Sequence, residues 1–240
     1  MISRFYYHIL SVFVLLPAFL LGEGIVIILN GPSAAGKTSI QNELQKKSKQ
    51  FYLKVGIDTF FDALLPAPDL SAFEKTKELS QYTNDGILIR QVRLKIDKEG
   101  HQIVPLTIGP AGDLVIHGMH AAIEAYAQQG NNLVVDYILY KPEWLANLVN
   151  ALKNNKTVYF IGIKAPLHVL EEREKKRATS PVGHARSHYN TVHTNMVYDL
   201  ELDVSALTPE QSAAKIQQFI ENNPSPTALM TMKKRQETAF

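Results

Sequence analysis

Residues 31–38 constrain this chain more than any other segment, because they match the phosphate-loop pattern G-x-x-x-x-G-K-[ST] at every fixed position. The apolar run 25–29 before them predicts a buried strand, and residues 39–47 after them predict a helix. Glycines let such a loop turn tightly enough for successive N–H groups to point at one anion, and the helix N-terminus adds partial positive charge. A glycine-rich turn with a chance lysine is the alternative, and the agreement of both flanks argues against it.

The loop pattern predicts a role for each of its residues. Loop N–H groups would hold phosphate oxygens, Lys37 would reach the β- and γ-phosphates, and the hydroxyl of Thr38 would ligate Mg²⁺. We therefore expect ATP and Mg²⁺ as cofactors. The expected nucleotide-binding residues are Gly31, Pro32, Ser33, Ala34, Ala35, Gly36, Lys37, Thr38 and Ser39.

Length and composition fit one α/β domain. The chain has 240 residues, of which 45% are hydrophobic and 20% are charged, which is enough for a sizeable core. A net charge of +2, without a basic stripe interleaved with aromatic residues, does not indicate a nucleic-acid partner. The absence of cysteine excludes disulfides, thiolate metal ligands and cysteine nucleophiles. The sequence does not set the oligomeric state.

Residues 1–22 form an apolar N-terminal segment. Arg4 is followed by an apolar run over 9–21, which has the length of a signal peptide and is short for a membrane span. This pattern predicts export or membrane tethering, with membrane contact limited to these residues. An apolar helix packed on the domain and a start codon placed too early are the alternatives. A need for ATP favours the cytoplasm, so the sequence leaves the localisation open.

Strand and helix signals alternate from residue 24 to about residue 222, which is typical of a parallel sheet with helices on both faces. We predict an α/β fold over 23–222, a three-layer sandwich of the phosphate-loop NTPase type with a mostly parallel five-stranded sheet and a lid. The predicted strands are 25–29, 52–57, 132–135, 157–163 and 198–203. The predicted helices are 39–47, 121–129, one from 142, one over 166–177 and one that Thr208 caps.

Two segments depart from this alternation. Residues 66–113 are long for a simple connection, so we expect an insertion over the active-site edge, with a hairpin formed by 94–97 and 101–104. Residues 223–240 are rich in Pro, Ser, Thr and Lys, and we expect them to form a flexible tail.

Two aspartates follow predicted strands, at the sheet edge where open parallel sheets bind ligands. Asp136 suits the acidic residue that holds Mg²⁺ directly or through water; a solvent-facing strand end is the alternative. Asp58 suits the residue that orients an acceptor hydroxyl and takes its proton; a helix cap is the alternative.

The helix predicted over 166–177 carries several cations and begins a candidate lid. Arginines there could close on the transferred phosphoryl group and exclude water. Arg173 and Arg177 lie one turn apart and are the leading candidates, whereas a solvated charged face explains most of the other cations. Two histidine pairs lack a matching carboxylate motif and do not predict a metal site. These pairs are His117 with His120 and His184 with His188.

Several short motifs follow one another in a specific order, at 28–38, 55–58, 108–110, 134–136, 160–163, 172–174 and 197–203. The ordered set resembles the chloramphenicol phosphotransferase family, small phosphate-loop kinases similar in fold to shikimate and adenylate kinases. The resemblance implies ATP- and Mg²⁺-dependent phosphorylation of a small-molecule hydroxyl, with chloramphenicol and antibiotic resistance as one candidate role. It implies Asp58 as general base and Arg173 and Arg177 as lid arginines. The chain departs from the family at 179–181, in its longer insertion and in its apolar N-terminus.

Two other functions stay open at this point. One is the phosphorylation of a nucleotide sugar, as in toxin kinases that share an early strand-end aspartate; the acceptor that gains phosphate would distinguish it. The other is a nucleotide-dependent switch with little turnover, because nucleotide binding does not guarantee chemistry. ATP consumption with and without acceptor would separate the switch from a kinase.

Overall fold

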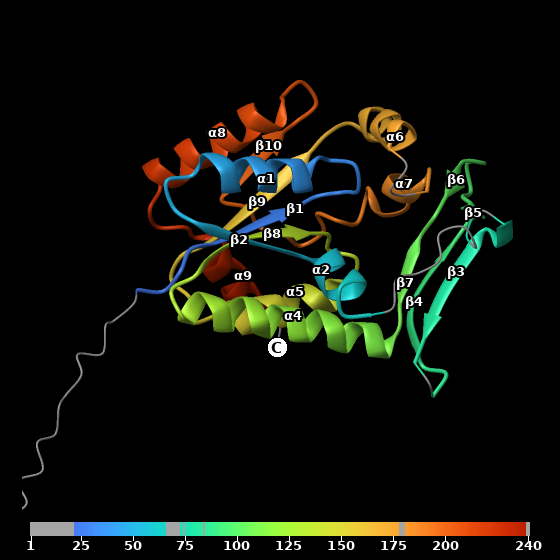
Figure 1. Cartoon of the computed structure of the whole chain (residues 1–240), viewed down its shortest axis with the longest axis horizontal. Helices are drawn as coiled ribbons and strands as arrows, with labels where there is room; N and C mark the ends of the chain where they lie inside the picture. The colour runs from blue at the N-terminus through green and yellow to red at the C-terminus, as the bar shows by residue number, and fades with distance from the viewer. Residues whose placement is uncertain (1–21, 66–72, 74, 84, 178–180, 239–240) are drawn as a thin grey trace, which may run out of the picture.

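The computed structural model describes residues 22–65, 73, 75–83, 85–177 and 181–238. These residues form three layers, with a five-stranded parallel sheet between two layers of helices (Figure 1). The predicted fold class is therefore confirmed. The predicted N-terminal segment lies outside the described residues, apart from Gly22. Within the described part of the chain, every helix is too short or too polar to cross a membrane.

The central sheet has the strand order β10-β9-β1-β8-β2, and every neighbouring pair in it is parallel. β1 is buried along its whole length, as expected for a strand that helices cover on both faces. The predicted strands agree with these five to within a few residues. The five strands are β1 Val26–Asn30, β2 Tyr52–Gly56, β8 Asn132–Tyr137, β9 Val158–Lys164 and β10 Leu200–Asp203.

Helices cover both faces of the sheet and form two apolar cores with it. On one face, α1 and α8 bury residues such as Ile40, Leu44 and Ile216. On the other face, α4, α5 and α9 bury Met119 and Trp144 among others (Figure 1). The bounds of these helices are α1 Lys37–Lys47, α4 Pro110–Gln128, α5 Pro142–Leu152, α8 Pro209–Asn222 and α9 Ala228–Glu237.

The helix starts follow local sequence signals where these are strong. The backbone N–H of Gln211 donates to the Thr208 hydroxyl at 3.2 Å, and the side-chain Oε1 of Gln211 accepts from the Thr208 N–H at 2.9 Å, which completes a capping box for α8. The predicted start of α4 at residue 121 is wrong. The helix begins at Pro110, after Gly109, because its first turns bury Gly112 and Ile116 against the core.

The predicted flexible tail over 223–240 is also corrected by the structure. Residues 228–237 form α9, which buries Leu229 and Met232 in the core. The carboxylate of Asp199 accepts from the N–H groups of Thr227 and Ala228 at 2.7 and 2.9 Å, and from that of Phe160 at 2.9 Å. A side chain from the edge of the sheet therefore anchors the N-terminus of α9.

The inserted segment contributes two small antiparallel sheets at the side of the domain (Figure 1). The first has the order β3-β4-β7, and the second pairs β5 with β6 and confirms the predicted hairpin. The predicted insertion ends inside α4, which already begins at Pro110. The strands are β3 Glu78–Tyr82, β4 Leu88–Arg93, β5 Lys95–Ile96, β6 Gln102–Ile103 and β7 Leu106–Ile108.

Three short helices complete the site edge of the domain. α2 (Ile57–Asp62) begins directly after β2, so residue 57 starts a helix instead of ending the predicted strand. α6 (Leu167–Lys176) follows β9, and α7 (His184–His188) comes after a connection whose residues 178–180 lie outside the described part of the chain.

Candidate active site

The loop between β1 and α1 has the backbone shape of an anion-binding loop. Ala34 and Gly36 both have positive φ, of 61° and 87°, and α1 begins at the next residue, Lys37. Residues in left-handed and right-handed backbone conformations in turn point successive N–H groups into the concave side of the loop. At Gly31 a Cβ atom would collide with the carbonyl oxygen of Ile163, so this position requires glycine. The loop is therefore shaped to receive phosphate oxygens at a helix N-terminus.

Three of the predicted residues meet at the start of α1. The Thr38 hydroxyl donates to Oδ2 of Asp136 at 2.6 Å, and the Lys37 ammonium lies 3.4 Å from Oδ1 of the same carboxylate. Lys37 also donates to the carbonyl oxygen of Pro32 at 3.0 Å and is buried. A hydroxyl oxygen beside a carboxylate is the hard oxygen pair that suits Mg²⁺, so these side chains fit the ion that the loop implies.

Sheet register brings Asp136 to the loop and Asp58 to Asp136. Asp136 pairs with Leu29 of β1 on one side and with Gly56 of β2 on the other. Asp58 follows Gly56 closely, in the first turn of α2. A Cβ at Gly56 would lie 3.1 Å from the Asp136 carbonyl oxygen, so the two strands approach closely here. Parallel neighbours thus place both predicted aspartates at one edge.

Asp58 is open to the cleft and has an altered proton affinity. Desolvation by the surrounding protein raises the pKa of its carboxyl above the ordinary value of 3.8, and the charges of Asp136 and Asp62 raise it further. Lys37 and Arg90 act in the opposite direction with smaller effect. α2 has no side-chain hydrogen bond at its cap, so the structure gives no support to the helix-cap alternative for Asp58.

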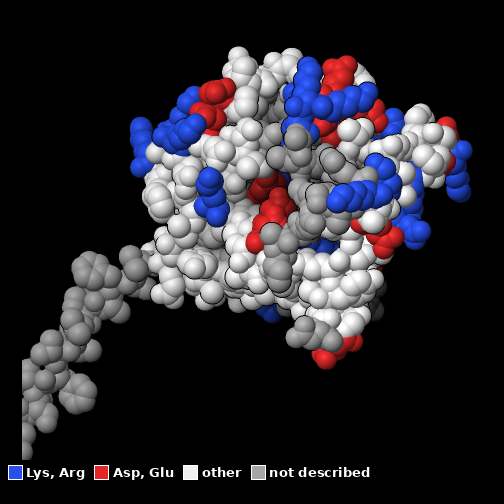
Figure 2. Space-filling model, turned by 45° about the vertical axis from the view of Figure 1, so that its right-hand side comes forward, with Lys and Arg blue, Asp and Glu red and all other residues white. Residues whose placement is uncertain are grey.

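Asp58 opens into a cavity of about 130 Å³ that lies between the phosphate loop and the insertion. Acidic side chains gather near the centre of the face shown in Figure 2, and lysine and arginine side chains lie around them. The walls combine residues of the central sheet with residues of β4 and β7. The lining residues are Thr38, Gln41, Gly56, Ile57, Asp58, Thr59, Phe61, Arg90, Leu106, Ile108, Asp136, Ile138 and Tyr140.

The two predicted lid arginines make different contacts. Arg177, just after α6, donates from Nη2 to the Ser33 hydroxyl at 3.0 Å, which brings it onto the phosphate loop. Arg173 donates from Nη2 to the carbonyl oxygen of Val204 at 2.8 Å, after β10. Both also line a second cavity beside the loop. Its other lining residues are Ala34, Ala35, Gly36, Ser39, Ile40, Val204, Leu207, Pro209 and Ser212.

Two histidines of α7 contact the phosphate loop and the wall of the cleft. The Ser33 N–H donates to Nε2 of His188 at 3.0 Å, and the Tyr140 hydroxyl lies 3.0 Å from Nε2 of His184. Nδ1 of His184 lies 2.8 Å from the carbonyl oxygen of Val104, which requires a proton on Nδ1 and leaves Nε2 to accept. Burial lowers the pKa of both imidazoles, so both are neutral at pH 7.

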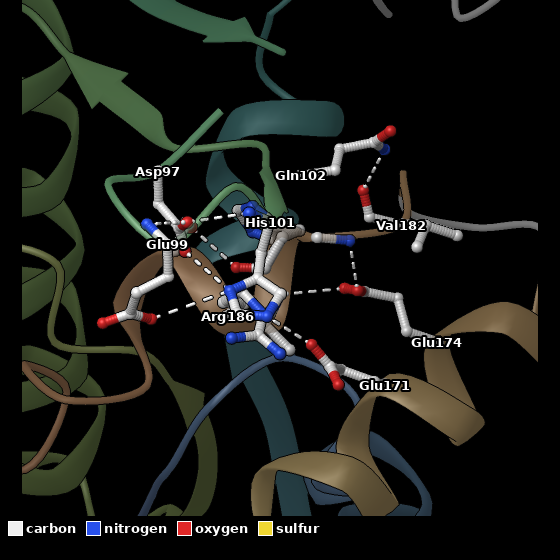
Figure 3. A network of polar contacts seen from close by, with 12 residues as sticks. Asp97, Glu99, His101, Gln102, Glu171, Glu174, Val182 and Arg186 are labelled. Atoms are coloured by element: carbon white, nitrogen blue, oxygen red, sulfur yellow. Dashed lines mark hydrogen bonds and ion pairs between the residues drawn. The ribbon is translucent and has the colours of Figure 1, made fainter. Parts of the chain in front are cut away.

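The insertion makes a set of polar contacts with residues 182–183, which lie just before α7 in the candidate lid (Figure 3). The Gln102 amide donates to the Val182 carbonyl oxygen at 2.9 Å, and the Val104 N–H donates to the Gly183 carbonyl oxygen at 3.0 Å. Buried Glu174 of α6 accepts from the Gly183 N–H at 2.7 Å and from the Ala185 N–H at 2.9 Å. The β5–β6 hairpin therefore contacts the same segment that leads to α7.

A family model described as "Chloramphenicol phosphotransferase-like protein" matches residues 24–221. The chain belongs to this family. Two relatives from Mycobacterium tuberculosis, in strains CDC 1551 / Oshkosh and ATCC 25618 / H37Rv, are each named "Putative O-phosphotransferase". Each is 29% identical over 218 residues, which is 89% of this chain and 89% of the relative. The family resemblance of the motifs is thereby confirmed.

Solved structures of kinases share the fold of this family member. A sugar kinase from Janibacter sp. HTCC2649 superposes with a TM-score of 0.53 at 16% identity, covering 84% of this chain and 96% of that chain. Shikimate kinase from Acinetobacter baumannii gives a TM-score of 0.51 at 15% identity, with 83% and 94% covered. Membership of the family makes the chain a small-molecule kinase, and the two solved structures show its fold.

Sequence reasoning missed several residues of the cleft. Arg90, Tyr140 and His188 were not predicted, because each comes from a segment whose position depends on tertiary folding. The ordering of the motifs gave no signal for Arg90, which lies in the insertion. His184 and His188 lie four residues apart with their rings in contact; His188 accepts from the loop, and His184 contacts Tyr140.

Proposed function

We propose that the protein transfers the γ-phosphoryl group of ATP to a hydroxyl of a small organic acceptor, in the manner of chloramphenicol 3-O-phosphotransferase. The observation that carries this proposal is the continuity of two features: the Lys37–Thr38–Asp136 cluster at the loop and the Asp58 cavity beside it. A donor and an acceptor bound there would meet within one cleft.

On the nucleotide side, the loop N–H groups and Lys37 bind the β- and γ-phosphates and stabilise charge that develops in the transition state. Thr38 and Asp136 would hold Mg²⁺, which supplies charge neutralisation at the phosphates. Arg177 would approach the γ-phosphate, which its contact with Ser33 supports, and Arg173 lines the second cavity, where the nucleoside would sit.

On the acceptor side, Asp58 orients the hydroxyl and takes its proton. A bond forms between the acceptor oxygen and the γ-phosphorus, the bond from that phosphorus to the β–γ bridging oxygen breaks, and ADP leaves. The raised pKa of Asp58 brings its proton affinity closer to that needed by a general base. Because phosphoryl transfer has a loose transition state, positioning by Asp58 contributes as well as proton removal.

The test combines nucleotide binding with product analysis. Calorimetry with ATP and Mg²⁺ measures binding, and mass spectrometry detects phosphorylated products from a panel of hydroxylated small molecules that includes chloramphenicol. For Asp58→Asn we expect transfer to fall about 10²- to 10⁴-fold with an unchanged ATP affinity. Asp203→Asn, a strand-end aspartate at the same edge that lines neither cavity, is the matched control.

Each part of the proposal has its own contradicting result. Full turnover in Asp58→Asn would remove Asp58 from the role of base. If calorimetry of the wild-type chain detected no heat of binding from ATP, ADP or GTP at millimolar concentration, nucleotide binding and the proposed reaction would both be contradicted.

A further inference from the structure

Arg90 is the only lysine or arginine among the described residues that line the Asp58 cavity, the proposed acceptor cavity. It comes from β4, the middle strand of the β3-β4-β7 sheet, where it pairs in register with Gln81 on one side and Ile108 on the other. The insertion thus delivers one fixed positive charge to a cavity whose other charged groups are the carboxylates of Asp58 and Asp136.

The Arg90 guanidinium is held in place before any acceptor binds. Nε donates to the Gln81 side-chain oxygen at 2.9 Å, Nη2 donates to Oδ1 of Asp62 at 2.9 Å, and the group lies 5.2 Å from the centroid of the Phe61 ring. The side chain is 14% exposed. A guanidinium fixed in this way loses little further freedom when it binds a ligand.

The bonds to Gln81 and Asp62 do not use the whole hydrogen-bonding capacity of Arg90. These two bonds leave from Nε and Nη2, whereas a guanidinium has five N–H donors. Asp62 offers one oxygen, and its side chain is 54% exposed, so water screens much of its charge. An anion inside the cavity would meet the guanidinium among apolar walls formed by Leu106, Ile108 and Ile138, where charge attraction is stronger than in water.

We propose that the acceptor is an anionic hydroxy compound, with a carboxylate that Arg90 binds and a hydroxyl that Asp58 orients. This inference rests on the proposed function and adds the class of substrate. A planar carboxylate can take two parallel N–H donors from one guanidinium, which fixes the acceptor as well as attracting it. Without Arg90 the two aspartates would repel an anion, and with a neutral acceptor the half-exposed Asp62 would be the one carboxylate among the described residues paired with the guanidinium.

Matched acceptors test the proposal directly. Transfer rates are compared within pairs that differ only in charge: gluconate with gluconamide, glycerate with glyceramide, and shikimate with its methyl ester. Chloramphenicol serves as a neutral acceptor and glycerol 3-phosphate as an anion of another kind. We expect kcat/KM for the acid to exceed that for its neutral partner at least tenfold, and the carboxylates to exceed glycerol 3-phosphate.

Variants of Arg90 separate recognition from structure. Arg90→Met is expected to abolish the preference for the acid within a pair. Arg90→Lys is expected to retain part of it, because lysine keeps the positive charge but cannot donate two parallel N–H bonds to a carboxylate. Asp62→Asn keeps the guanidinium and is expected to keep the preference. The ratio within a pair is insensitive to the fraction of folded enzyme, and the lysine variant preserves the test if the methionine variant does not fold.

Contradicting results are distinct from failure of the proposed function. Equal rates for acid and neutral partner, an unchanged ratio in Arg90→Met, or a ratio lost equally in Asp62→Asn would overturn recognition by Arg90. ATP binding with no transfer to any acid of the panel would also overturn it. Transfer to a neutral acceptor that still depends on Asp58 would leave the proposed reaction standing, whereas absence of ATP binding would remove both.

Discussion

The proposed nucleotide side and the proposed acceptor side of the cleft are built from different kinds of chain segment. The nucleotide side uses one continuous loop, 31–38, and one aspartate that parallel register places beside it. The acceptor side combines α2 with β4 and β7, two strands of an antiparallel sheet far along the chain. Short-range sequence therefore dictates the shape of the loop proposed to hold phosphate, whereas the folding of an insertion dictates the walls of the proposed acceptor cavity.

Apart from the loss of transfer expected for Asp58→Asn, the largest expected effect isolates the nucleotide side. Lys37→Met removes the ammonium that lies in the loop, and we expect transfer to fall about 10²- to 10³-fold, because a charge stabiliser of the transferring phosphoryl group is lost. Steady-state kinetics with ATP and any accepted substrate measures the effect. Lys47→Met, at the exposed end of the same helix, is the control. Retention of more than a tenth of the activity in Lys37→Met would contradict this division of the cleft.

An intermediate effect is expected where the insertion meets the lid. Gly183 has a φ of 96°, and a Cβ there would lie 2.6 Å from the carbonyl oxygen of Gln102. Gly183→Ala should therefore lower the free energy of unfolding by about 1–3 kcal/mol. It should also slow transfer about 10- to 100-fold by displacing the lid, since misplaced groups lose rate steeply.

Gly100→Ala, in the β5–β6 hairpin that contacts Gly183, provides the control for that change. Gly100 also has a positive φ, of 85°, but a Cβ there meets nothing within 4 Å. Urea unfolding and transfer assays on both variants separate backbone strain from loss of the contact. Equal transfer rates in the two variants would show that the insertion does not act on the lid.

The smallest expected effect concerns the stability of the acceptor side. Because the pKa of Asp58 is raised in the folded chain, the folded state holds its proton more readily than the unfolded state does, and ionisation at neutral pH opposes folding. Asp58→Asn should raise Tm at pH 7.5, and the gain should be small because Asp58 is exposed to the cleft and water screens its charge. The difference should shrink as the pH falls toward 3.8, where the unfolded carboxyl is also protonated.

Thermal unfolding of wild type and Asp58→Asn between pH 7.5 and pH 4 measures this difference. A variant that is less stable than wild type at pH 7.5 would contradict the sign. Together with the loss of transfer, a gain in stability would show that this position is adapted to chemistry at some expense to folding.

The sequence predicted those parts of the fold that local patterns determine. β1, β8 and β9 carry apolar runs, the loop carries its own motif, and α8 carries a capping box at Thr208. These signals lie within a few residues of the feature they specify, so they can be recognised without knowledge of the tertiary structure.

Features that depend on distant contacts were beyond these patterns. α9 begins with Thr227 at its cap, and the group that satisfies its first N–H groups is Asp199, far earlier in the chain. The polar composition after residue 222 therefore indicated a tail. The first turns of α4 carry Gly112 and Asp113, which obscured the apolar spacing of a helix that continues to Gln128. Arg90 enters the cleft only because β4 pairs with β7.

The attachment of α9 has a practical consequence for work with this protein. A chain shortened after Asn222 would leave the Asp199 carboxylate with one amide donor instead of three and would uncover the apolar side of α5. Fusion partners are therefore best joined beyond α9 rather than in its place, since the end of this chain closes the layer that supports β9.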